Sequence, residues 1–118
     1  MAQLIYKVLS RDLWTAAEAA GQFEGAGIDL ADGYIHFSTG EQLVETVEKH
    51  FAGQADLVLV AVDANALSES VGEALKWEPS RGGALFPHLY TPLPMSAVKS
   101  VDDLPLGDGG KHQFSANF

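Results

Sequence analysis

The sequence is organised around residues 32–39, which read Asp32-Gly33-Tyr34-Ile35-His36-Phe37-Ser38-Thr39 and lead directly into residues 40–51. We interpret residues 32–39 as a short strand that ends at a helix N-terminus. Because side chains alternate along a strand, Ile35 and Phe37 would face the core. His36 would share the other face with the phenol of Tyr34 and the hydroxyl of Ser38. This stretch therefore predicts a polar site beside the first backbone N–H groups of the helix.

The helix over residues 40–51 is the clearest element in the sequence. Two pairs at its start match the capping-box pattern: Thr39 with Gln42, and Ser38 with Glu41. Apolar side chains recur on one face at helical spacing: Leu43, Val47 and Phe51. Glu45 and Lys49 are placed to pair on the exposed face.

The remaining elements are predicted from apolar runs and the residues between them. Strands are expected at residues 3–9, 57–62, 71–77, 86–90 and 97–101, and residues 25–27 and 80–83 are expected to be loops. A helix over 11–20 would start at Ser10, end at Gly21 and bury Leu13, Ala16, Ala17 and Ala20, and residues 63–67 would form a short helical turn. Because strands outnumber helices and the two helices lie in the N-terminal half, the chain is predicted to be an α+β protein. Residues 1–105 would form a single domain, and 106–118 a loop-like tail.

Composition limits the class of protein. The chain has 118 residues, 47% hydrophobic and 19% charged, as expected for one compact globule. It contains no cysteine, which excludes disulfides, thiolate metal sites and a cysteine nucleophile. The longest apolar run, 57–62, is only strand-sized, and the first residues show no secretory signal. We therefore expect a cytoplasmic protein.

The charge balance limits the partners. Sixteen acidic residues against seven basic ones give a formal net charge of -9. Such a surface repels phosphate backbones and anionic lipids, so we expect neither nucleic acid nor a membrane as a partner. A pocket with a local arginine could still hold one small phosphate ligand.

Three segments carry candidate site residues. His36 with Ser38 and Thr39, beside the helix N-terminus, could bind an anion or a carbonyl group, or these residues could be a core histidine and two caps. Glu78 beside Pro79, followed by Arg81 in a glycine-flanked loop, could polarise a ligand or form an ordinary surface pair. His88 and Tyr90 would share one face of a strand, either at a site or as edge-strand aromatics.

Other kinds of site have weaker support. A metal triad of His36, Glu78 and His88 has suitable ligand types but lacks short ligand spacing, so no metal site is predicted. The chain has no Gly-x-Ser-x-Gly elbow, no P-loop and no dinucleotide-binding glycine motif.

The order of four motifs resembles the bacterial family catalogued as domain of unknown function 952. These motifs are Asp32-Gly33-Tyr34-Ile35-His36-Phe37-Ser38-Thr39, Leu57-Val58-Leu59, Trp77-Glu78-Pro79 and Phe86-Pro87-His88-Leu89-Tyr90. The resemblance covers about residues 3 to 101.

The resemblance implies an ADP-ribosyltransferase-like fold, with a split mixed or antiparallel sheet, two front helices and a cleft that holds NAD in true transferases. His36 would take the place of the histidine that contacts a ribose of NAD. Phe37 departs from the small glycine usual after that histidine. Glu78 is the candidate for the catalytic glutamate, although its Trp-Glu-Pro setting differs from the transferase motif.

The leading hypothesis is a cleft that binds a small nucleotide-like ligand such as NAD or ADP-ribose. It would be lined by His36, Ser38, Thr39, Glu78, Arg81, His88 and Tyr90. His36 and Glu78 would act in any ADP-ribosyl transfer or glycohydrolysis, and Arg81 would neutralise a phosphate. The alternatives are a non-catalytic binding or interaction module on the same scaffold and a metal-dependent small-molecule enzyme.

Overall fold

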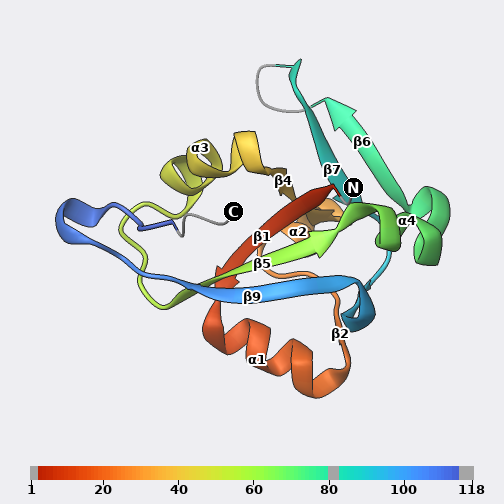
Figure 1. Ribbon diagram of the computed structural model, residues 1–118, viewed down its shortest axis with the longest axis horizontal. Helices are drawn as coiled ribbons and strands as arrows, with labels where there is room; N and C mark the ends of the chain where they lie inside the picture. Colours follow the sequence, from red (N-terminus) through yellow and green to blue (C-terminus); the bar gives the residue numbers. More distant parts are fainter. Residues whose placement is uncertain (1–2, 80–82, 115–118) are drawn as a thin grey trace.

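The computed structural model describes residues 3–79 and 83–114 (Figure 1). Its α-helices are α1 (Arg11–Ala20), α2 (Ile28–Asp32), α3 (Gly40–His50) and α4 (Ala64–Val71). Its strands are β1 (Leu4–Ser10), β2 (Gln22–Phe23), β3 (Ile35–His36), β4 (Ser38–Thr39), β5 (Leu57–Asp63), β6 (Leu75–Pro79), β7 (Leu85–Leu89), β8 (Leu93–Pro94) and β9 (Val98–Leu104). Short 3-10 turns follow α4, precede β9 and lie at residues 108–110.

The strands form three antiparallel sheets. The largest has the order β4-β1-β5-β9, the second has the order β3-β7-β6, and β2 pairs with β8. β5 lies at the centre of the largest sheet, and its residues from Leu57 to Val62 are all buried. The predicted α+β class is confirmed, and the burial of every residue from Leu57 to Val62 shows that β5 is covered on both faces.

The largest sheet separates two hydrophobic cores. On one face, residues such as Ile5, Val58 and Val60 pack against Trp14 of α1 and Leu67 of α4. On the other face, Tyr6, Val8 and Leu59 pack against Leu43 and Val47 of α3. Figure 1 shows α1 and α3 on opposite sides of β1, β5 and β9. Alternation along β1 and β5 supplies both cores from the same strands.

The predicted strand over residues 32–39 is broken into two strands that join different sheets. β3 pairs with β7, whereas β4 pairs with β1. Between them Phe37 is buried and donates its N–H to the carbonyl of Pro87 at 3.0 Å. The segment therefore links the two larger sheets. The alternation of side chains could not predict this break, because alternation does not show which strand each part of the segment pairs with.

The two predicted helices are present as α1 and α3, and the described residues contain two further α-helices, α2 and α4. Asp32 belongs to α2, which ends at Gly33 with a positive φ of 86°. Residues 64–71 form α4 rather than a short turn and the start of a strand, because the Asp63 side chain caps the helix at Asn65 and Ala66. A full helix after β5 moves the start of the next strand to Leu75.

The buried face of α1 also differs from the prediction. Ser10 caps the helix and Gly21 ends it, as expected. However, Trp14 and Ala17 are the buried residues, while Leu13 is 49% exposed. Trp14 packs against Phe23 with ring centroids 6.0 Å apart. The larger side chain therefore decides which face of the helix turns inward.

Residues 106–114 run back over the molecule. Leu106 and His112 form an isolated antiparallel bridge, and the His112 ring donates to the carbonyl of Gln54 at 2.7 Å. Phe114 packs against the core on the α3 side. Residues 115–118 lie outside the described residues, as do 80–82, so the expected loop there is not described.

Replacing Thr39 by Ala tests the capping box at the start of α3. The Thr39 hydroxyl accepts from the N–H of Gln42 at 3.3 Å, and the Gln42 side chain accepts from the N–H of Thr39 at 3.0 Å. We expect Thr39→Ala to lower the free energy of unfolding by about 1 kcal/mol in urea denaturation, because one cap bond is lost. Thr15→Ala on the exposed face of α1 is the matched control and should cost nothing. Equal effects of both substitutions would contradict the capping role.

Candidate functional site

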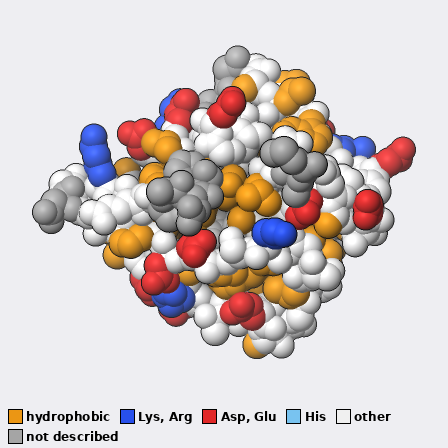
Figure 2. Space-filling model, viewed as in Figure 1, with side chains coloured by type: hydrophobic (Ala, Val, Ile, Leu, Met, Phe, Trp, Pro, Cys, Tyr) orange, Lys and Arg blue, Asp and Glu red, His pale blue; other side chains and the backbone are white. Residues whose placement is uncertain are grey.

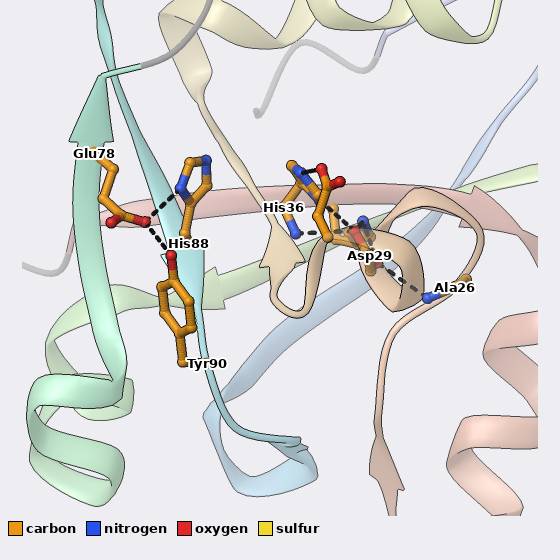
Figure 3. Close-up of polar contacts among 8 residues, drawn as sticks. Ala26, Asp29, His36, Glu78, His88 and Tyr90 are labelled. Carbon is orange, nitrogen blue, oxygen red and sulfur yellow. Dashed lines mark hydrogen bonds and ion pairs between the residues drawn. The ribbon is translucent and has the colours of Figure 1, made fainter.

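His36 lies between two carboxylates. Its Nδ1 is 2.6 Å from Oδ1 of Asp29, and its Nε2 is 3.0 Å from Oδ2 of Asp32. An ionised carboxylate only accepts hydrogen bonds, so each ring nitrogen donates to the carboxylate that faces it. Making both bonds at once requires a ring that carries a proton on both nitrogens. His36 is therefore held as a hydrogen-bond donor, and Figure 3 shows its contact with Asp29.

Asp29 is the buried centre of this group, with only 2% of its surface exposed. Its oxygens also accept from Nζ of Lys7 at 2.8 and 3.0 Å, and from the backbone N–H groups of His36 and Ala26 at 3.0 and 3.1 Å. Burial raises the pKa of Asp29, but the hydrogen bonds from His36 and the charge of Lys7 bring the pKa down to about 2. Burial lowers the pKa of Lys7. Asp29 therefore remains ionised and fixes the orientation of His36.

A second histidine has a carboxylate partner of its own. Nδ1 of His88 is 2.9 Å from Oε1 of Glu78, and the Tyr90 hydroxyl donates to the same oxygen at 2.7 Å. These bonds, from Tyr90 and then His88, lower the pKa of Glu78, while the bond to Glu78 raises the pKa of Tyr90 to about 12. Figure 3 shows the three side chains meeting between β6 and β7.

The two histidines are direct neighbours across strands. His36 of β3 is the register partner of His88 of β7, and their ring centroids are 5.5 Å apart. Tyr34 stacks on His88 at 4.3 Å with an interplanar angle of 9°, and its ring centroid is 4.5 Å from that of His36. Tyr34 therefore supports both imidazoles, a role that the sequence analysis did not assign to it.

A cavity of about 460 Å³ opens beside the two histidines. Its polar lining includes His36, His88, Lys7 and Ser38, together with Ser10, Thr46, His50 and Gln54, while its walls are mostly apolar. The walls include Tyr6, Val8, Leu43, Phe51 and Phe86, and the exposed side chains of Leu13 and Ile28 lie at its edge. This composition, a largely apolar pocket with a few converging polar groups, is typical of small-molecule sites.

Not all predicted site residues reach this cavity. His36, Ser38 and His88 line it, whereas Glu78 and Tyr90 lie behind His88 and do not. The Ser38 hydroxyl bonds to that of Thr46 at 2.9 Å, and Thr39 is used in the capping box. Arg81 lies outside the described residues.

Sequence analysis assigned no role to Asp29, Asp32 or Lys7, and it placed Tyr34 on the face of His36 without including it among the site residues. The one available signal was Lys7, a lone charge within an otherwise apolar strand, which requires a buried partner. Within residues 3–79 and 83–114, no group of three or more His, Asp or Glu side chains is arranged to hold a metal ion. The same residues contain no helix that is long and apolar enough to span a membrane.

The visible surface carries scattered charges. In Figure 2, acidic side chains are spread over the face with apolar side chains between them, and the few Lys and Arg side chains drawn there are separated from one another. This distribution matches the net charge of -9.

Fold and site define a small α+β protein with a cavity lined by two histidines that are each hydrogen-bonded to a carboxylate. Residues 8–101 match the family described as Protein of unknown function (DUF952), and the chain belongs to this family. The family membership predicted from the motifs is thus confirmed.

Solved structures of one relative are similar to this chain. A crystal structure of protein CC0527 from Caulobacter crescentus is 59% identical, covers 93% of each chain and has a TM-score of 0.85. A crystal structure of a double mutant of that protein gives the same values. Its solution NMR structure is 58% identical, covers 93% of this chain and 91% of that one, and has a TM-score of 0.80. No curated protein matches the chain.

Replacing Asp29 by Asn tests the buried charge cluster. The substitution leaves Lys7 buried without its ionised partner, so we expect the free energy of unfolding to fall by about 3 kcal/mol or more. Asp102→Asn on the exposed side of β9 is the control and should change it by less than about 0.5 kcal/mol. A loss for Asp29→Asn no larger than the control would contradict the assigned role.

Acid titration of stability gives an independent test. The pKa of Asp29 in the folded protein, about 2, lies below the value of about 3.9 for an unfolded chain. The stability contributed by the ionised form is therefore complete above about pH 4 and is lost as the pH falls through about 2. We expect the difference in unfolding free energy between wild type and Asp29→Asn to shrink over this interval. A constant difference from pH 6 to pH 2 would contradict this assignment.

Proposed function

We propose that this protein binds a small organic molecule in the cavity beside His36 and His88. The observation that carries the proposal is the pairing of these two histidines, each hydrogen-bonded to a carboxylate, in the lining of a mostly apolar cavity. The apolar body of the ligand would lie against the cavity walls, and its hydroxyl or carbonyl group would contact the imidazoles. Ordering these side chains before binding lowers the entropic cost of binding.

A nucleoside or nucleotide is the ligand class that we propose first. The resemblance to ADP-ribosyltransferase-like proteins implies a ligand of the NAD or ADP-ribose type, with His36 at a ribose. A ribose offers hydroxyls to the histidines, and a base offers a flat apolar surface to walls such as Phe86 and Phe51. In this proposal Arg81 would meet a phosphate.

The second candidate is a non-catalytic binding or interaction module on the same scaffold. The arrangement of Glu78 favours it over transferase or glycohydrolase chemistry that uses this carboxylate directly. Oε1 of Glu78 already accepts from His88 and Tyr90, and Glu78 is not among the residues that line the cavity. A carboxylate that stabilises a reacting sugar must face it.

Calorimetric titration with NAD, ADP-ribose and uncharged adenosine tests the proposed function. We expect saturable binding of at least one of them, and at least tenfold weaker binding by His36→Ala, because a hydrogen bond from a charged group contributes about 1.5–3 kcal/mol. The control is His112→Ala: this imidazole donates to the backbone carbonyl of Gln54, but His112 itself does not line the cavity. Absence of heat with all three ligands from a folded protein would overturn the nucleotide-type proposal. Equal weakening by both variants would show that binding occurs elsewhere.

A further inference from the structure

The arrangement of the two histidines points to a reaction as well as to binding. We infer that the cavity catalyses the hydrolysis of small uncharged acyl esters, with His88 as the general base and His36 as the hydrogen-bond donor to the carbonyl oxygen. The inference rests on the proposed function, because it uses the same cavity and requires that a small molecule enter it.

His88 is placed as a base. Its Nδ1 donates to Glu78, which leaves the lone pair of a neutral ring on Nε2. His88 is 4% exposed and lines the cavity, and its ring stacks on that of Tyr34. The Tyr90 hydroxyl in turn fixes Glu78. A buried imidazole whose tautomer is set by a carboxylate is the arrangement that general-base catalysis requires.

His36 is placed as a donor to an oxygen that gains negative charge. Asp29 holds its Nδ1, and the 3.0 Å contact between Nε2 and Asp32 shows that this nitrogen already binds a negatively charged oxygen. The side chain of Asp32 is 41% exposed, so it can turn toward solvent when a carbonyl oxygen takes its place. Donors of this kind stabilise the oxyanion of acyl transfer.

The groups that face the cavity favour acyl transfer over other hydrolytic reactions. Glycosidic bonds are cleaved by carboxylates that flank the bond, but here Glu78 and Asp29 stand behind the imidazoles. Phosphoryl transfer needs free positive charge, whereas Lys7, the lysine of this cavity wall, is paired with Asp29. The Ser38 hydroxyl bonds to Thr46 rather than to a histidine, so water is the nucleophile.

The step balances without a further reactant. Nε2 of His88 takes a proton from water as the water oxygen bonds to the acyl carbon, and the carbonyl oxygen becomes an oxyanion that accepts from Nε2 of His36. The tetrahedral intermediate collapses, the bond from carbon to the alcohol oxygen breaks, and His88 returns its proton to that oxygen. One ester and one water yield one carboxylic acid and one alcohol.

Hydrolysis of p-nitrophenyl acetate, an uncharged ester with an apolar ring, tests the inference. We expect saturable release of p-nitrophenol, with kcat/KM lowered about 100-fold or more by His88→Gln and by His36→Gln. His112→Gln is the matched control and should leave the rate unchanged. Equal losses in the three histidine variants would overturn the inference, because they would show unspecific catalysis by surface imidazoles.

Glu78 acts through His88 and is therefore a positioning residue. Glu78→Gln keeps an oxygen that accepts from Nδ1 and should retain most of kcat, whereas Glu78→Ala should lower kcat about tenfold or more with little change in KM. A ¹⁵N NMR spectrum of the wild-type histidines should show His88 protonated at Nδ1 and unprotonated at Nε2. The opposite tautomer would overturn the assignment of His88 as base, and this measurement does not depend on whether the variants fold.

Binding of the amide analogue 4-nitroacetanilide separates the two proposals. Saturable binding that His36→Ala weakens, without any turnover of the ester, would overturn the hydrolase inference and leave the binding function standing. No binding of this analogue, of adenosine or of NAD would overturn both.

Discussion

The ionised side chain of Asp29 is the constraint on which the site depends. Burying a carboxylate is costly unless its oxygens are fully hydrogen-bonded and its charge is compensated. Here Lys7, the ring and backbone of His36 and the backbone of Ala26 meet that need together. These partners come from β1, from the loop before α2 and from β3. One buried carboxylate therefore binds three separate segments of the chain and fixes the orientation of the His36 ring.

The break in the polar segment explains why a cavity forms at this place. His36 is the last residue of β3, which pairs with β7, and Ser38 is the first residue of β4, which pairs with β1. Phe37 lies buried between them. The helix α3 begins immediately after β4. Residues of β1, α3 and β7 line the cavity, and the link between the two sheets brings His36 and Ser38 into the same lining.

The two histidine–carboxylate pairs are built in different ways. The Asp29 pair is buried and includes a lysine, whereas the Glu78 pair lies near the surface and is completed by Tyr90. In both pairs, a carboxylate that does not line the cavity holds Nδ1 of a histidine that does. The two histidines line the cavity, whereas Glu78, the carboxylate that the sequence predicted in the cleft, does not.

Local patterns determined the parts of the protein whose contacts lie within a few residues along the chain. These include the apolar β5, the capping box at Thr39 and Gln42, the end of α1 at Gly21, and the burial of Ile35 and Phe37. Only the tertiary structure decided that Lys7 meets Asp29 across 22 positions, that Glu78 serves His88, and that Trp14 turns α1 inward. The physical reason is that spacing encodes the face on which a side chain lies, whereas the partner it meets depends on how separate segments pack.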